Sequence, residues 1–291
     1  MKRRIAVCLS LAMSMTLVLS GCGKSDVGRA AKDLKGSEVI AAVNPEKVPQ
    51  TAKNRKDTLI IGFTAPEGKF NPIYESSVDD GYVAQLVFEG LLTNDAKGNP
   101  VEKVAKKWEI SKDSKTYTFH LNKGIKFSNG EELTAKDVEF TYTAICDPKY
   151  DGPRTDAVDK LVGYKEYNKG DAKTVKGIKV IDENTISFTL TDVKAPALSS
   201  DFIYGIMCKS YYTFEKGNID KLKKTFLKPM GSGPYILKSY KAGQEADFEK
   251  NPDYWKGEAK INKLILKVTN AQTGIQSLSA GEKIGRASCR E

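Results

Sequence analysis

The sequence predicts an α/β fold built on a mixed sheet, and two observations carry that prediction. Short apolar runs with strand patterning recur from residue 58 onward, and segments with helical spacing separate some of them. Strands and helices interleave without a strict βαβ repeat, which favours a sheet with both parallel and antiparallel pairs. The composition agrees, because 291 residues with 40% hydrophobic and 29% charged residues are typical of one or two folded globular domains.

Four elements are expected in the first half of the folded region. Residues 58–64 form a β-branched apolar run that predicts a buried strand. Residues 79–92 carry apolar side chains at helical spacing, with acidic residues at the start, and predict a helix. Residues 95–100 are turn formers and predict a loop. Residues 116–121 alternate between apolar and polar side chains, so we expect a strand with one buried face.

The second half begins with a capped helix. Thr134 and Asp137 have the spacing of a capping box, with Asp in place of Glu or Gln, and they precede a helix that carries Val138, Tyr142 and Ile145. Residues 178–190 then predict a β-hairpin that turns at Asp182-Glu183-Asn184. The remaining predicted elements are strands at 236–240, 246–250 and 261–268 and a closing helix at 272–280.

The N-terminus predicts an export signal. Residues 2–4 are basic, residues 5–19 are apolar, and Leu-Ser-Gly-Cys follows at 19–22. A basic start and a short apolar run indicate a signal peptide at residues 1–21 rather than a spanning helix. The last four of these residues resemble the bacterial lipobox, which implies lipidation of Cys22; a plain cleavage site is the alternative.

The segment after the lipobox predicts a tether. Residues 22–57 are polar with little periodicity, so we expect a flexible linker between the lipid and the domain, in which residues 27–40 could form a weak helix. Several acyl chains hold a protein firmly on a membrane. We therefore expect a lipid-anchored protein on the extracytoplasmic face of the cell membrane.

The last eight residues, 284–291, are expected to be foreign to the fold. A back-translation of this octapeptide resembles a common sequencing adapter, so we expect the natural sequence to depart from this chain after about Lys283. A natural basic tail is the alternative.

Charge and cysteine content exclude some classes of protein. The formal net charge of +9 comes partly from the two ends, and the other Lys residues interleave with Asp and Glu without an Arg-rich run, so we expect no nucleic-acid partner. Cys8, Cys22 and Cys289 fall in the two ends. We expect Cys146 and Cys208 to be buried free thiols, with a disulfide between them as the alternative.

No pattern predicts catalysis, a metal site or a cofactor. The chain has one histidine, His120, in an alternating strand, and no Cys/His cluster. The glycines at 62 and 68 are one residue too far apart for a phosphate-binding loop, and Phe70 stands where a Ser or Thr would be required. Gly231-Ser232-Gly233 lacks the spacing of a nucleophile elbow. We expect no enzyme, no catalytic residue, no metal and no cofactor.

Two stretches carry a resemblance to a known family. The first runs from Gly90-Leu91-Leu92-Thr93 through Val104-Ala105-Lys106-Lys107-Trp108 to Leu133-Thr134-Ala135-Lys136-Asp137-Val138. The second is Gly231-Ser232-Gly233-Pro234-Tyr235 with Asn251-Pro252-Asp253-Tyr254-Trp255. Both resemble the family 5 extracellular solute-binding proteins, which are the oligopeptide, dipeptide and nickel-binding components of ABC importers. The resemblance covers about residues 58–283.

The resemblance implies a periplasmic-binding-protein-like lobe of type II with an inserted α+β domain. Residues 58–90 would be the first segment of the main lobe, 91–197 the inserted domain and 198–283 the second segment. The second lobe of the clamp would follow and is missing. Because affinity in a clamp depends on burial from both sides, we expect the chain alone to bind ligand very weakly.

The resemblance also implies a function and partners. The whole gene product would be a monomer that captures a peptide or similar small solute and delivers it to an ABC permease driven by a separate ATPase. Two other functions remain open: a surface receptor that senses peptides, and a lipid-anchored hydrolase. Nickel or haem remain open as ligands.

The candidate ligand contacts come from three loops of the resembling region. The first follows the first strand, the second follows Asp147-Pro148, and the third re-enters the main lobe. Core packing is the alternative for each aromatic residue, and a solvated charge is the alternative for Arg154. The candidates are Phe70, Asn71, Pro72, Tyr150, Gly152, Arg154 and, more weakly, Tyr204.

Overall fold

The structure is a computed structural model that describes residues 49–282 and 285–286. The expected signal peptide at 1–21, the lipidation site Cys22 and the tether up to residue 48 lie outside the described residues. So does the octapeptide at 284–291 except Gly285–Arg286, which pair with the first strand of the sheet although the octapeptide was expected to be foreign to the fold. In the described part of the chain no helix has the length and apolar character needed to cross a bilayer.

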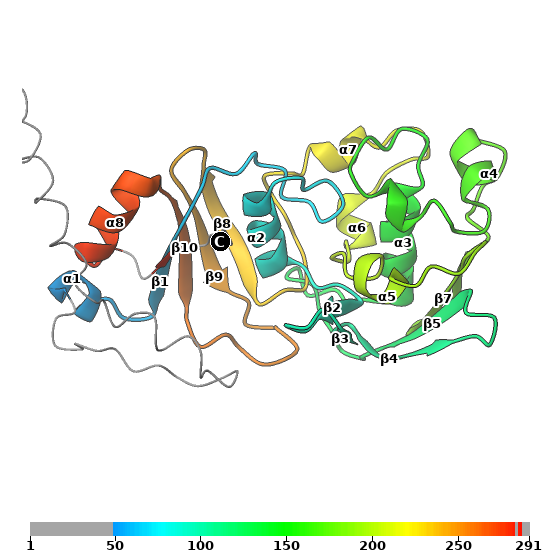
Figure 1. Ribbon diagram of the computed structural model, residues 1–291, viewed down its shortest axis with the longest axis horizontal. Helices are drawn as coiled ribbons and strands as arrows, with labels where there is room; N and C mark the ends of the chain where they lie inside the picture. Colours follow the sequence, from blue (N-terminus) through cyan, green and yellow to red (C-terminus); the bar gives the residue numbers. More distant parts are fainter. Residues whose placement is uncertain (1–48, 283–284, 287–291) are drawn as a thin grey trace, which may run out of the picture. The chain divides into compact units, whose positions relative to one another are not determined.

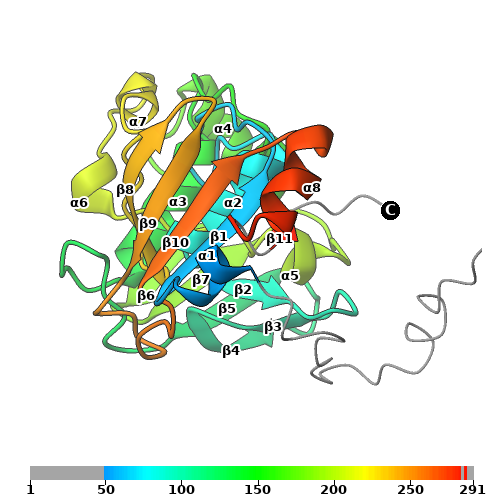
Figure 2. The same ribbon diagram turned by 90° about the vertical axis from the view of Figure 1, so that its left-hand side faces the viewer.

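A five-stranded mixed sheet forms one layer of the fold (Figure 2), in the order β11-β1-β10-β9-β8. β1 pairs in parallel with β10, from Thr58 opposite Lys263 to Phe63 opposite Val268, and also pairs in parallel with β11. The other pairs are antiparallel. The mixed sheet predicted from the sequence is therefore confirmed. Its strands are β1 (Thr58–Phe63), β8 (Tyr235–Lys241), β9 (Glu245–Lys250), β10 (Lys263–Val268) and β11 (Gly285–Arg286).

A four-stranded antiparallel sheet forms a second layer, in the order β4-β5-β7-β6. Helix α3 (Ala135–Ile145) packs against β6 and β7 (Figure 1). A two-stranded pair, β2 with β3, precedes this sheet. The strands are β2 (Leu92–Asn94), β3 (Pro100–Glu102), β4 (Ala105–Ile110), β5 (Thr116–Leu121), β6 (Ile178–Asp182) and β7 (Thr185–Thr189).

Helix α3 begins where the capping box predicted. Asp137 Oδ2 accepts hydrogen bonds from the backbone N–H of Thr134 (2.9 Å) and from its hydroxyl (2.9 Å). Val138, Tyr142 and Ile145 are buried, as their spacing predicted. The predicted strand at 116–121 is confirmed as β5, and its buried and partly exposed residues alternate.

Helix α2 (Val78–Val87) ends earlier than the helix predicted at 79–92. Phe88 takes an extended backbone, and Gly90 then pairs with Gly205 in an isolated bridge. A Cβ on Gly90 would lie 2.4 Å from the carbonyl oxygen of Ile203, so only glycine allows this approach. The tertiary contact ends the helix, and the apolar residues after it enter β2.

Aromatic side chains form the centre of the core around the four-stranded sheet. The rings of Phe119 and Phe202 lie 4.7 Å apart, and those of Phe188 and Phe202 lie 5.0 Å apart. Tyr142 of α3 packs on Phe188 at 4.8 Å. These separations suit edge and tilted packing of aromatic rings. Phe202 therefore holds the segment that follows α5 (Ala197–Ser200) against both the four-stranded sheet and α3.

Cys146 and Cys208 are both buried and form no disulfide within residues 49–282 and 285–286, which confirms the expectation of free thiols. Burial raises the pKa of both thiol groups.

The last part of the expected tether contains one helical turn, α1 (Gln50–Lys53). Thr51 Oγ1 donates to the carbonyl oxygen of Ala280 at 2.6 Å, and Arg55 Nη2 donates to that of Gly281 at 2.6 Å. These bonds attach the segment to the end of α8 (Ala271–Ser279). The other short helices are α4 (Tyr164–Lys169), α5 (Ala197–Ser200), α6 (Lys209–Tyr212), α7 (Asp220–Lys223) and a 3-10 turn at Thr155–Ala157.

Candidate functional site

A cavity of about 510 Å³ lies beside α2, and we refer to it as the α2 cavity. Its volume falls in the range of small-ligand sites. The lining comes from the loop before α2, from α2 and the chain that follows it up to β2, from residues 103 and 154, and from residues 203–205. The lining residues are Pro72, Glu75, Gly81, Ala84, Gln85, Phe88, Gly90, Thr93, Asn94, Lys103, Arg154, Ile203, Tyr204 and Gly205.

Three of the seven sequence-predicted contacts, Pro72, Arg154 and Tyr204, line this one cavity. They come from three different loops, so the fold brings together residues that are far apart in the chain. The Arg154 guanidinium lies 4.9 Å from the centre of the Tyr204 ring, within the range of a cation–π contact.

Tyr150 and Gly152 lie in the segment next to Arg154 but outside the lining of the cavity. The Tyr150 hydroxyl donates to the carbonyl oxygen of Ile73 and accepts from the backbone N–H of Arg154 at 3.1 Å. A Cβ on Gly152 would lie 2.4 Å from the Tyr150 hydroxyl oxygen, so a side chain there would displace the tyrosine. Both residues position the loop that carries Arg154, and neither lines the α2 cavity.

Phe70 and Asn71 are fully covered by protein and do not line the cavity. The Phe70 ring packs on Tyr240 with 4.8 Å between ring centres. Asn71 Oδ1 accepts from the backbone N–H of Ile73 at 3.1 Å, and its Nδ2 faces the sulfur of Met207 at 3.4 Å. The two residues hold the loop whose next residue, Pro72, reaches the cavity.

An ion pair between Arg154 and Glu75 forms part of the cavity wall. Arg154 Nη2 also donates to the backbone carbonyl of Glu75 at 3.0 Å. Burial raises the pKa of the Glu75 carboxyl, although the guanidinium beside it acts in the opposite direction. The Arg154 and Glu75 side chains are 23% and 16% exposed, so the pair is largely shielded from water.

A second ion pair joins Lys103 to Glu89. Lys103 Nζ lies 3.2 Å from Glu89 Oε2, and the Glu89 side chain is only 2% exposed. The Tyr254 hydroxyl donates to Glu89 Oε1 at 2.8 Å. Glu89 immediately precedes Gly90 of the first resembling stretch, and Tyr254 belongs to the second. Sequence reasoning missed Glu89, Lys103 and Glu75, and no local pattern marks them as partners.

The α2 cavity consequently carries no uncompensated charge among the residues that line it. Each of its cations, Lys103 and Arg154, has its own carboxylate within ion-pair distance. The uncharged polar residues of the lining are Gln85, Thr93, Asn94 and Tyr204. Such a wall disfavours a ligand group with an unpaired charge, which would lose its hydration, and suits amide groups and apolar side chains.

The described residues contain no group of three or more His, Cys, Asp or Glu side chains placed to hold a metal ion. His120 lies on β5, and its Nε2 is 3.2 Å from Glu109 Oε1, an exposed side chain. It does not line the α2 cavity.

Comparison with known proteins places the chain in a family. Residues 99–284 match the family described as bacterial extracellular solute-binding proteins, family 5 middle. The chain is 31% identical to Di/tripeptide-binding protein 1 of Pseudomonas aeruginosa over 260 residues, which are 86% of this chain and 46% of that protein. It is 29% identical to the oligopeptide-binding protein OppA of Bacillus subtilis over 97% of this chain and 49% of that protein.

The fold is similar to that of a solved member of the family. The oligopeptide-binding protein AppA of Bacillus subtilis, in complex with a nonapeptide, matches with a TM-score of 0.69 and 25% identity, over 78% of this chain and 43% of that one. The chain thus spans about half the length of the proteins it matches. The resemblance seen in the sequence is confirmed, and so is the α/β lobe of this type. The chain belongs to the bacterial extracellular solute-binding proteins of family 5.

Proposed function

We propose that this protein is the substrate-binding lipoprotein of an ABC importer that captures peptides outside the cell membrane. The observation that carries the proposal is the neutral wall of the α2 cavity, in which both cations are already paired. A peptide presents mainly uncharged amide groups between its ends, so this wall suits the middle of a peptide. The relatives named for dipeptide and oligopeptide binding support the same class of ligand.

The partners follow from this role. A permease in the membrane would receive the peptide, and a separate ATPase would drive transport. Lipidation of Cys22 would hold the protein, as a monomer, on the extracytoplasmic face of the membrane, with residues 22–48 and the segment that follows as the tether.

We place one wall of the peptide site in this chain. The chain spans about half the length of its relatives, so the opposite wall would come from sequence beyond these 291 residues. A clamp gains affinity by excluding water from both sides of the ligand. These residues alone would therefore bind peptide at least about 100-fold more weakly than the full-length gene product.

Two experiments on the full-length gene product test the proposal. Protein purified from its host under native conditions is denatured, and released small molecules are identified by mass spectrometry; the expected result is a mixture of peptides. A deletion strain made auxotrophic for one amino acid should then fail to grow on peptides that contain it and still grow on the free amino acid. If peptides are released from the purified protein but the deletion strain still grows on peptides, a sensing receptor would be favoured over an importer component. Release of haem or a metal chelate from the purified protein would contradict the proposal.

A further inference from the structure

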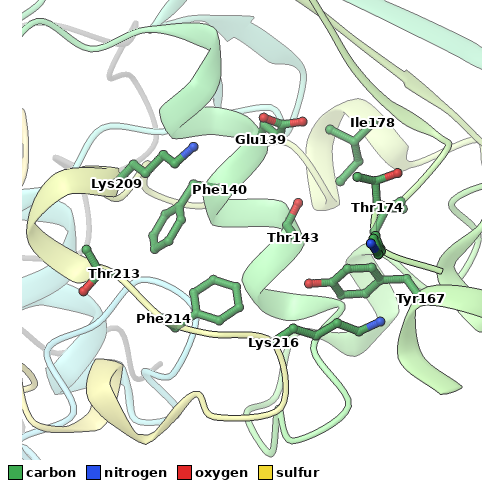
Figure 3. A pocket seen from close by; sticks show the side chains of 12 residues that line it. Glu139, Phe140, Thr143, Tyr167, Thr174, Ile178, Lys209, Thr213, Phe214 and Lys216 are labelled. Carbon is green, nitrogen blue, oxygen red and sulfur yellow. The ribbon is translucent and has the colours of Figure 1, made fainter. Parts of the chain in front are cut away.

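A second cavity lies against α3 (Figure 3). It shares no lining residue with the α2 cavity. We call it the α3 pocket. Its volume is about 380 Å³, which is enough for a small molecule. It is enclosed by α3, by residues 167–178 on one side and by residues 209–216 on the other.

Two apolar walls form a slot in this pocket. Phe140 of α3 and Phe214 lie on one side, with 5.2 Å between ring centres. Tyr167 and Ile178 lie across from them, and Thr143 of α3 stands between the two walls (Figure 3). A slot with aromatic side chains on both walls favours a planar apolar group, because aromatic rings gain contact area and favourable edge interactions there.

The two walls are tied to each other. Lys216, next but one to Phe214, extends its ammonium group to 4.2 Å from the centre of the Tyr167 ring. The same Nζ donates to the carbonyl oxygen of Ala172. The loop after α6 is thereby attached to the opposite wall, so contacts within the chain hold the two walls of the slot together.

The charges at the rim differ from those of the α2 cavity. Lys173, Lys209 and Lys216 line the α3 pocket with a single carboxylate, Glu139. In the described part of the chain none of these three ammonium groups has a carboxylate within ion-pair distance. The rim therefore has uncompensated positive charge above an apolar slot, which complements an anion attached to an apolar body.

We infer that the α3 pocket binds a small aromatic monocarboxylate, with its ring in the slot and its carboxylate toward the lysines of the rim. The site is separate from the α2 cavity, so the inference does not depend on the proposed transport of peptides.

Two probes of the same shape and opposite charge test the inference: 3-phenylpropionate and phenethylamine. Each is titrated against the full-length gene product by ligand-observed saturation-transfer NMR. We expect saturable binding of 3-phenylpropionate at one site and at least about tenfold weaker binding of phenethylamine. Equal affinities would show that charge plays no part, and absence of saturable binding would show that there is no site; either result overturns the inference.

Four variants locate the binding. Thr174→Trp, at an exposed lining position, should block the slot and abolish binding. The double variant Lys173→Gln/Lys209→Gln should weaken the carboxylate at least about tenfold, whereas Glu139→Gln should strengthen it. Lys179→Gln, an exposed change on β6 outside the lining, is the matched control and should change nothing. Binding that survives Thr174→Trp would lie elsewhere and would contradict the inference.

Discussion

At the scale of single residues, the α2 cavity depends on ion pairs that neutralise its wall. Of the two carboxylates in these ion pairs, Glu89 is more deeply buried than Glu75. Glu89 holds Lys103 at the cavity, and the Tyr254 hydroxyl donates to its other oxygen. The Lys103 ammonium is held by Glu89 and is therefore not free to pair with a charged group of a ligand. If the cavity receives uncharged groups as proposed, we expect that preference to depend on this one buried carboxylate.

Glu89→Gln should change that selectivity. Glutamine keeps an oxygen for the Tyr254 hydroxyl but leaves the Lys103 ammonium uncompensated at the cavity. In the full-length gene product we expect the affinity ratio between a peptide with a central Glu and its Gln counterpart to rise about tenfold, or about 1.4 kcal/mol, by calorimetry. Glu258→Gln, which breaks a surface pair with Lys250, is the control and should leave the ratio unchanged. The same ratio in both variants would show that Lys103 does not face the ligand.

Asp80 contributes a pH dependence of stability. Its side chain is fully buried, Oδ1 accepts from the backbone N–H of Gly68 at 2.9 Å, and Oδ2 has no hydrogen-bond partner among the described residues. Burial raises the pKa of this carboxyl above its ordinary value of 3.8. The folded state therefore holds the proton more tightly than the unfolded chain. The resulting stabilisation is complete below about pH 3.8 and is lost as pH rises through the raised pKa.

Asp80→Asn should remove this dependence. The melting temperature of the variant relative to the wild type should increase as pH rises from 4 to 7, measured by differential scanning calorimetry. Asp192→Asn, an exposed change, serves as the control and should give a constant difference. A constant difference for Asp80→Asn would contradict the assigned role of the buried carboxyl.

Sequence reasoning found part of the site at this scale. Arg154, Tyr204 and Pro72 were predicted because the resemblance placed their loops near a cleft, and the structure brings them to one cavity. Glu89 and Tyr254 were not predicted as partners, because 165 residues separate them and only the folded chain brings them together. Whether these residues contact a peptide stays a prediction.

At the scale of elements, capping and burial determine which helices could be predicted. Helix α3 has a capping box and an apolar face, and its predicted start is confirmed. Helices α5, α6 and α7 have four residues each and no apolar period to detect. Strand β4 was missed because four of its six residues are exposed, so its sequence, Ala-Lys-Lys-Trp-Glu-Ile, does not show the alternation of a half-buried strand.

Asp137 contributes to the placement of α3 through two sets of hydrogen bonds. Its Oδ2 accepts from the backbone N–H of Thr134 at the start of α3. Its Oδ1 accepts from the backbone N–H of Lys209 at 2.9 Å and so joins α3 to α6. Asp137→Ala should lower the free energy of unfolding by about 2–4 kcal/mol, because it leaves partly buried donors unpaired. Thr134→Ala should cost only about 1 kcal/mol. Urea denaturation measures both values, and equal costs would show that the bond to α6 contributes nothing.

At the scale of the whole molecule, the mixed sheet and the antiparallel sheet carry different parts of the site. The mixed sheet supports α2, and the residues around the antiparallel sheet supply Lys103 and Arg154 to the wall of the α2 cavity. The mixed sheet was predicted from the strand patterns. Its strand order could not be predicted, because the parallel pair of β1 and β10 joins segments more than 200 residues apart.

Calorimetric titration of the full-length gene product with di- to pentapeptides tests whether the protein captures peptides. We expect saturable one-to-one binding with a dissociation constant of about 10 µM or tighter for at least one peptide with an uncharged middle residue. We also expect no comparable binding of the constituent free amino acids. Folded protein, verified by circular dichroism, that shows no saturable binding of any peptide would contradict the claim that this is a peptide-capturing protein.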